Sequence, residues 1–339
     1  MSVASPGPLS GPLAISLGDP AGIGPELIAE AWSRRDSERL PPFAVIGGAE
    51  ILRAAARSRG IELPVKAIAS LDAAGDAFAA ALPVLDLQDG AWSPGAPSRE
   101  GAELAMGSLA EATRRTVRGE AAALVTGPVA KARLAEVGFD HPGQTEYVAT
   151  ACGIASGDAV MMLAGPRLRA VPLTVHVALA QVPTLLTRDL IVRRARIVAT
   201  ALQSDFGVSR PRLAIAGLNP HAGEDGRFGD EEQRIIAPAV ALLREEGIDA
   251  AGPFPPDAMF TARAREQYDA ALCMFHDQAL IPLKTLDFDE GVNVTLGLPL
   301  VRTSPDHGTA FDIAGKGLAD PGAMIAAIRM AGDCAARRG

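Results

Sequence analysis

The 339-residue sequence has little of several features that mark large protein classes. Aromatic residues make up only 4% of it, and its three cysteines show no CxxC spacing, which argues against a disulfide framework or a zinc knuckle. No apolar run approaches the ~18 residues of a membrane span. The N-terminal stretch lacks the basic start and apolar core of a signal peptide. We therefore expect a cytoplasmic chain with no membrane partner.

An excess of positive charge is also missing. The formal net charge is -8 at pH 7. Proteins that bind nucleic acids neutralise phosphates with Lys and Arg, so this balance argues against a nucleic-acid partner. The chain is 48% hydrophobic and contains 35 Gly and 26 Pro, a mixture typical of a globular α/β enzyme. Its length suggests two domains on a prior of roughly 150 residues each.

A conventional dinucleotide-binding fingerprint is absent too. The segment GDPAGIGPE, residues 18–26, follows a predicted strand at 13–17 and precedes a predicted helix at 26–34. It matches neither GxGxxG nor GxxxxGK[ST], because Leu27 stands where a third glycine is needed. Two interpretations stay open: these glycines bring the backbone close to a ligand, or they only allow a tight turn.

Apolar runs and amphipathic stretches alternate along the rest of the chain, which predicts an α/β fold. The predicted strands cover 43–48, 159–163, 168–177, 212–218, 270–275 and 293–301, and a strand turns into a helix within 122–131. The other predicted helices cover 49–59, 101–118, 187–206, 231–246 and 321–338, and one starts at Tyr147.

Three of the five histidines stand in or at the end of a predicted apolar strand. His176 lies within PLTVHVAL, on the face of Thr174 and Ala178 by strand periodicity, while His221 and His276 follow strands. Imidazoles that converge from separate strands can hold Zn²⁺ or a similar ion. Their spacing is no motif, however, and each histidine alone is more often structural. A metal site and three structural histidines therefore both stay open.

Polar residues follow His276 at regular intervals. Asp277 is placed to orient an imidazole, or it serves as a helix cap. Lys284, Asn293 and Arg302 then offer a point charge, an amide and a bidentate guanidinium, a set that suits a phosphorylated or carboxylated small molecule. Ordinary surface charge is the alternative. The glycine-rich stretch 306–321 allows close backbone approach to a ligand, or simply forms two tight turns.

Several segments together resemble the 4-hydroxythreonine-4-phosphate dehydrogenase family of pyridoxal phosphate biosynthesis. These are GDPAGIGPE, TGPVAK, PGQTEY, VPLTVHVAL, GLNPHAGEDGRFGDEE, FHDQALIPLK and DHGTAFDIAGKG. They run in order from about Ala14 to the last predicted helix. The first and last are also similar to the isocitrate and isopropylmalate dehydrogenase group, which binds NAD without GxGxxG.

The resemblance implies a two-domain α/β fold of the isocitrate/isopropylmalate dehydrogenase type, with mixed sheets flanked by helices and a cleft between the domains. One domain would comprise 12–130 plus 302–339 and carry the cofactor-binding loops. The other would comprise 131–301 and carry the metal and substrate site and the dimer interface. The active site would lie at the subunit interface of a homodimer.

The resemblance also implies the site residues. His176, His221 and His276 would hold a divalent ion (Zn, Mg or Co), with ligands from both subunits. The substrate-binding positions would be Gln144, Thr145, Lys284, Asn293 and Arg302. NAD or NADP would lie along a loop that includes His307, Gly308, Thr309, Ala310, Asp312 and Gly315. Lys284 and Asp277 are the candidates for catalytic roles.

The implied reaction is the oxidation of 4-phosphooxy-L-threonine in vitamin B6 biosynthesis, but one departure from the family pattern bears on it. Many members have His-Thr where this chain has Gln144-Thr145, and a glutamine can donate a hydrogen bond but carries no charge. Related substrates thus stay open: 4-phospho-D-threonate, 4-phospho-D-erythronate or a cis-dihydrodiol dicarboxylate. From other classes, the alternatives are a histidine-metal hydrolase that needs no nicotinamide and a non-catalytic metal-binding protein.

Overall fold

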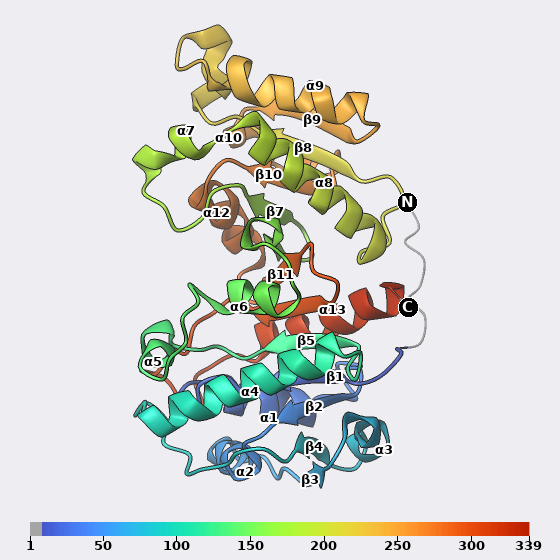
Figure 1. The fold of residues 1–339 in the computed structure, drawn as a ribbon, viewed down its shortest axis with the longest axis vertical. Helices are drawn as coiled ribbons and strands as arrows, with labels where there is room; N and C mark the ends of the chain where they lie inside the picture. Colours follow the sequence, from blue (N-terminus) through green and yellow to red (C-terminus); the bar gives the residue numbers. More distant parts are fainter. Residues whose placement is uncertain (1–8, 339) are drawn as a thin grey trace. The chain divides into compact units, whose positions relative to one another are not determined.

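The computed structural model describes residues 9–338. These residues divide into two compact units. The terminal unit comprises residues 9–156 and 298–338, and the central unit comprises residues 157–297. In each unit, six paired strands are flanked by helices, so the predicted α/β class is confirmed (Figure 1). The antiparallel pairs that make the strand arrangement mixed lie in the central unit.

The terminal unit is built on a parallel sheet with strand order β3-β4-β2-β1-β5-β12. Its strands are β1 (Leu13–Ser16), β2 (Phe43–Ile46), β3 (Val65–Ile68), β4 (Leu82–Leu85), β5 (Ala123–Thr126) and β12 (Val301–Pro305). Its helices are α1 (Gly24–Ser33), α2 (Ala49–Ser58), α3 (Ala74–Phe78), α4 (Arg99–Val117), α5 (Lys131–Ala135), α6 (Gln144–Ala151) and α13 (Gly322–Arg338).

Helices cover both faces of this sheet. Every residue of β1, β2, β4, β5 and β12 is buried, the pattern of parallel strands sandwiched between helices. Helix α4 packs along β1, β2 and β5 and contacts α5 and α6, whereas α1 contacts α2 and α13 (Figure 1). Only the edge strand β3 is partly exposed.

Residues 131–156 belong to the terminal unit, although the sequence-based boundary assigned them to the other domain. Leu134, Phe139 and Tyr147 from this segment pack with Leu109 of α4 in one apolar cluster. Burial of these side chains against α4 holds the segment to the sheet that α4 covers.

The central unit contains a mixed sheet with strand order β11-β6-β7-β10-β8-β9. Strand β6 is antiparallel to both β11 and β7, and the run from β7 to β9 is parallel. The strands are β6 (Val160–Ala164), β7 (Arg169–Pro172), β8 (Arg212–Ala216), β9 (Asp249–Phe254), β10 (Ala270–Cys273) and β11 (Val292–Leu296). The helices are α7 (Val182–Leu185), α8 (Arg188–Ser204), α9 (Ala237–Glu245), α10 (Pro256–Met259), α11 (Ala262–Arg265) and α12 (His276–Asp287).

The parallel run β7-β10-β8 places three carboxyl-terminal strand ends side by side. Helix α12 packs against β7 and β10, and α8 packs against β6, β8 and β11. Segments that leave neighbouring parallel strands emerge at the same sheet edge, where α/β proteins bind ligands. Across residues 9–338, no helix has both the length and the apolar composition needed to cross a bilayer.

Several sequence-based element boundaries differ from the structure. The predicted strand 168–177 stops at Pro172. The predicted strand 293–301 corresponds to β11 and only the first residue of β12, because Gly297 turns the chain with a φ of +83°. The rest of β12 was not predicted as a strand. Strands β3, β4 and β9 were not predicted. The predicted helix 231–246 begins as a π-helical turn at Glu232–Ile236 before α9.

A close backbone approach at Gly127, directly after β5, generates a stability prediction. An alanine Cβ there would lie 2.7 Å from the Ser16 carbonyl oxygen and 2.8 Å from the Gly18 nitrogen. Backbone atoms cannot rotate away, so we expect Gly127→Ala to destabilise the protein by ~1–3 kcal/mol and to lower the calorimetric Tm.

Gly75→Ala in α3 is the matched control, because an added Cβ at Gly75 meets no atom within 4 Å. Alanine is also the better helix former, so this variant should keep or slightly raise the Tm. An unchanged Tm for Gly127→Ala would contradict the packing argument.

Candidate active site

Each of the neighbouring strands β7, β8 and β10 leads into a segment that carries a histidine. His176 follows β7, His221 follows β8, and His276 is the first residue of α12, after β10. The prediction that His176 lies within a strand is wrong. Its φ is +52°, a left-handed conformation, so it does not share a strand face with Thr174 and Ala178.

His176 and His276 form a pair. Their ring centroids lie 5.8 Å apart with an angle of 41° between the ring planes. Both rings line a cavity of about 280 Å³. The rest of its lining consists of Thr174, Val177, Leu179, Val182, Phe275 and Asp277.

The chemistry of this pair fits a divalent ion. Two imidazoles that share a cavity at this separation can both turn a nitrogen toward one ion. The Nδ1 atom of His276 lies 2.7 Å from Oδ1 of Asp277. A carboxylate on Nδ1 favours the tautomer with a proton there and leaves the Nε2 lone pair for a metal. The contact expected between Asp277 and an imidazole is therefore present.

His221 does not line this cavity. It is exposed, and its ring centroid lies 6.3 Å from that of Phe228. Within residues 9–338, no group of three or more His, Cys, Asp or Glu side chains is arranged to hold a metal ion. A single chain thus brings together two of the three predicted ligands, His176 and His276, and leaves His221 apart.

His221 opens a run of left-handed residues. The φ values of residues 221–225 are 52°, 52°, 81°, 40° and 56°, and only Gly223 among them is a glycine. Left-handed backbone costs roughly 1–2 kcal/mol per L-residue, so a run of this kind needs support from its surroundings.

A buried carboxylate supplies that support. Glu232 is 3% exposed. Its Oε1 accepts hydrogen bonds from the backbone N–H groups of Leu218 and Asn219, both at 2.7 Å, and its Oε2 accepts one from Nδ2 of Asn219 at 3.0 Å. Glu232 therefore holds the segment before the left-handed run through the backbone of Leu218 and Asn219 and through the side chain of Asn219.

A second polar cluster, in the terminal unit, surrounds Arg302. This side chain on β12 is 3% exposed. Its guanidinium donates to the Thr126 hydroxyl at 2.6 Å and to the Thr145 hydroxyl at 3.4 Å. Burial lowers the pKa of Arg302 to about 10, which still leaves it charged at neutral pH. A buried guanidinium that donates to hydroxyls and lies near the Glu146 carboxylate can also bind an anionic ligand.

Gln144 adds a hydrogen-bond acceptor beside this cation. It is the first residue of α6, and its Nε2 donates to the Gly127 carbonyl oxygen at 3.1 Å. Its Oε1 is buried and accepts no hydrogen bond within residues 9–338. The helix N-terminus itself has no side-chain cap. One amide N–H is engaged by Gly127, so Gln144 can offer a ligand its carbonyl oxygen as an acceptor and its second N–H as a donor.

The two remaining predicted substrate residues lie in the central unit. Lys284 is on α12, two turns after His276, and Asn293 is on β11 opposite Leu163 of β6. The Oδ1 of Asn293 is buried and accepts no hydrogen bond in the described part of the chain. Of the five predicted substrate residues, the structure brings Gln144, Thr145 and Arg302 together.

The predicted cofactor loop packs onto the GDPAGIGPE turn within the terminal unit. The backbone N–H of Ile23 donates to the Thr309 carbonyl at 2.9 Å, and Gly22 has no room for a Cβ, which would lie 2.8 Å from that oxygen. The backbone N–H of Gly315 donates to buried Glu26 at 3.3 Å. His307, Gly308, Ala310 and Asp312 lie on the same loop, with Ala310 at a φ of +43°.

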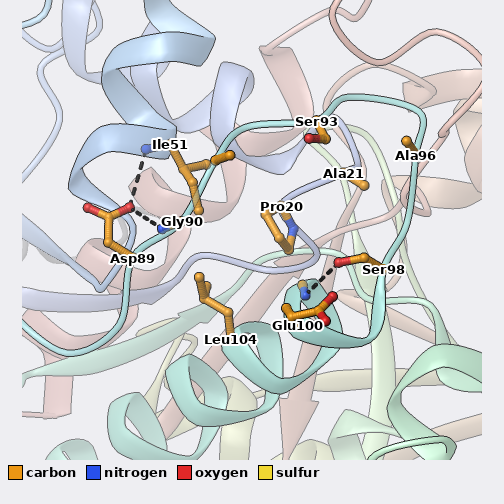
Figure 2. A pocket seen from close by; sticks show the side chains of 12 residues that line it. Pro20, Ala21, Ile51, Asp89, Gly90, Ser93, Ala96, Ser98, Glu100 and Leu104 are labelled. Atoms are coloured by element: carbon orange, nitrogen blue, oxygen red, sulfur yellow. Dashed lines mark hydrogen bonds between the residues drawn. The ribbon is translucent and has the colours of Figure 1, made fainter.

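A cavity of about 360 Å³, which the sequence does not predict, lies beside this turn (Figure 2). Pro20 and Ala21 line it together with residues from 89–104 and Ile51. Figure 2 shows Asp89 bonded to the start of α2 and Ser98 capping α4. Nothing in the local pattern of residues 86–98 predicts that this loop returns to Ala21, whose carbonyl accepts from Gly95 at 2.8 Å.

Comparison with known proteins identifies the family. A sequence model described as "Pyridoxal phosphate biosynthetic protein PdxA" matches residues 39–331. This chain belongs to the PdxA family. The predicted resemblance is thereby confirmed, and it covers most of both units.

Named relatives and solved structures are similar to this chain along nearly its whole length. The 4-hydroxythreonine-4-phosphate dehydrogenase of Erythrobacter litoralis (strain HTCC2594) is 63% identical over 96% of this chain and 97% of its own length. The crystal structure of that enzyme from Klebsiella pneumoniae is 37% identical, with a TM-score of 0.84 and coverage of 96% and 98%. A terephthalate 1,2-cis-dihydrodiol dehydrogenase from Burkholderia xenovorans LB400 is 28% identical, with a TM-score of 0.65 and coverage of 95% and 98%.

The buried guanidinium yields a test on anion binding. We expect Arg302→Gln to weaken sulfate binding more than tenfold in calorimetric titration, since loss of a buried charged partner costs ~2–5 kcal/mol. Thr126→Val, which removes one neutral hydroxyl, should weaken binding less.

The pH dependence follows from the lowered pKa. Arg302 loses its charge as the pH rises through about 10, so wild-type affinity for sulfate should fall there, while sulfate itself keeps its charge. Equal sulfate affinity in wild type and Arg302→Gln would exclude this residue as the anion site.

Proposed function

We propose that the chain oxidises 4-phosphooxy-L-threonine to 2-amino-3-oxo-4-phosphooxybutanoate with NAD or NADP and a divalent metal ion. The product is a β-keto acid and can lose CO₂ to give 3-amino-2-oxopropyl phosphate, a step toward pyridoxal 5'-phosphate. The observation that carries the proposal is the His176–His276 pair in one cavity, on a chain 63% identical to an enzyme of that name. Free thiols fit a cytoplasmic setting.

We assign the metal to His176, His276 and His221, with His221 contributed by a second copy of the chain. His221 lies outside the cavity of its own chain, yet it is exposed and held in place by the Glu232 contacts. An imidazole presented in this way suits a site shared across a homodimer interface. A Zn²⁺, Mg²⁺ or Co²⁺ ion bound there would supply Lewis-acid polarisation of the substrate hydroxyl.

The residues of the terminal unit define the substrate class. Arg302 and Thr145 would hold an anionic group of the substrate through charge-assisted hydrogen bonds. The free acceptor of Gln144 suits a donor such as the substrate ammonium. We assign Lys284 and Asn293 to further anionic and hydroxyl groups, and Lys284 to assistance in proton transfer.

The loop over residues 307–315 is the proposed cofactor site, with His307, Gly308, Thr309, Ala310, Asp312 and Gly315 in contact with the dinucleotide. NAD or NADP bound there would accept the hydrogen and electron pair that leave the substrate carbon. The packing of this loop on Gly22, Ile23 and Glu26 holds its backbone rigid. A rigid backbone positions a cofactor at little entropic cost.

Removal of the metal or of a ligand should abolish turnover. We expect His221→Ala to have no measurable NADH production while its circular dichroism spectrum and Tm match those of wild type, because the side chain is exposed. Chelation should inactivate wild type, and Zn²⁺, Mg²⁺ or Co²⁺ should restore wild type but not the variant. A wild-type rate in chelated His221→Ala would remove the metal from the mechanism.

A second candidate is oxidation of a cis-dihydrodiol dicarboxylate, favoured by the similarity to the Burkholderia xenovorans structure. A phosphorylated sugar acid, 4-phospho-D-threonate or 4-phospho-D-erythronate, is the third. These alcohols have anionic groups for Arg302 but no amine for Gln144. An ammonium donates a charge-assisted hydrogen bond to the buried acceptor of Gln144, which is stronger than the bond a hydroxyl would donate there, so this acceptor favours the amino alcohol.

A substrate panel with NADH absorbance as the readout separates these candidates. We expect turnover with 4-phosphooxy-L-threonine to be fastest. Gln144→Leu should raise its KM about tenfold and raise the KM of the amine-free alcohols less, because a hydroxyl donates a weaker hydrogen bond than an ammonium. A wild-type preference for an amine-free alcohol would contradict the assignment. Hydrolysis without NADH formation would instead indicate a metallohydrolase.

A further inference from the structure

We propose that Gln278 is a positioning residue that ties together the three histidine-bearing segments. The inference rests on the proposed function, because it concerns the residues assigned to the metal. Gln278 lies on the first turns of α12, two positions after His276, and is 9% exposed. Its amide is too deeply placed to meet substrate, so its role runs through its neighbours.

Both ends of the Gln278 amide are bonded to strand-end backbone. Its Oε1 accepts the N–H of Met274 at 2.6 Å, directly after β10. Its Nε2 donates to the carbonyl of Gly217 at 2.8 Å, directly after β8. One side chain therefore links the segment that enters His276 to the segment that enters His221.

The third segment joins through the same residue, Met274. The Thr174 hydroxyl donates to the carbonyl of Met274 at 2.8 Å, and Thr174 is 6% exposed and lies two residues before His176. Met274 is thus held at its N–H by Gln278 and at its carbonyl by Thr174. The positions of His176 and His276 are coupled through one buried residue, Met274.

Beyond Gly217, the coupling continues into the left-handed run. Gly217 precedes Leu218 and Asn219, whose N–H groups are bonded to Glu232. A Cβ on Gly217 would lie 2.9 Å from the Cα of Ala222, so this backbone is packed directly against the residue after His221. Movement of the Gly217 carbonyl would therefore shift the base of the His221 segment.

Two substitutions distinguish the hydrogen bond of the Gln278 carbonyl from that of its amide nitrogen. Gln278→Glu keeps an acceptor for Met274 but replaces the donor to Gly217 with a carboxylate oxygen. Gln278→Met has a similar length and removes both hydrogen bonds. Asp287→Asn is the matched control on the same helix, because Asp287 is 4% exposed and bonded to the backbone N–H and Nε of Arg167, away from the histidines.

Hydrogen exchange in the metal-free protein tests the coupling. We expect Gln278→Glu to raise amide exchange in residues 217–226 alone, and Gln278→Met to raise it in both 173–178 and 217–226. Asp287→Asn should raise exchange near Arg167 and leave both segments unchanged. Unaltered exchange of 217–226 in both Gln278 variants, or a uniform rise throughout the central unit, would overturn the inference.

Zn²⁺ titration tests the consequence for the site. Loss of a residue that orients metal ligands typically lowers metal affinity ~10- to 100-fold. We expect this loss in both Gln278 variants and unchanged affinity in Asp287→Asn. Wild-type affinity in the Gln278 variants would reduce Gln278 to a structural role. If the wild-type protein binds no Zn²⁺, the proposed metal centre is wrong. The hydrogen-exchange pattern alone would then show whether Gln278 couples the three segments.

Discussion

At the carboxyl edge of each sheet, backbone N–H and C=O groups leave the strand ladder while they are still buried, and each needs a partner other than water. Two side chains, Ser108 and Gln278, each bond to two such backbone groups. Ser108 accepts from Leu17 at 2.9 Å and donates to Ile46 at 2.7 Å, and Gln278 does the same for Met274 and Gly217. A buried group without a partner costs ~1–3 kcal/mol, so the turns that present the candidate site depend on these bridges.

The continuous apolar strands were predictable because helices bury them on both faces. Strands β1, β2, β8 and β10 appear in the sequence as short apolar runs followed by Gly or polar residues. Strand β3 is partly exposed and β4 contains Pro83, so neither gives such a run. The break between β11 and β12 depends on one left-handed glycine, Gly297, that periodicity does not show.

The candidate site was predictable as a set of residues but not as an arrangement. Polar residues after apolar strands pointed to His221 and His276, because strand ends deliver side chains to the sheet edge. The alternation in Val-His-Val imitates a strand at His176, where the chain in fact turns with positive φ. The pairing of His176 with His276, the separation of His221 and the burial of Arg302 depend on contacts between distant segments. The bridging role of Gln278 could not be predicted from neighbouring residues, since a glutamine in the first turn of a helix is common.

The left-handed run at 221–225 has a thermodynamic consequence. Contacts within the chain, such as those of Glu232, hold this strained backbone, so its free-energy cost lowers the stability of the fold. Selection for heat resistance and selection for catalytic geometry should therefore pull these five positions in opposite directions.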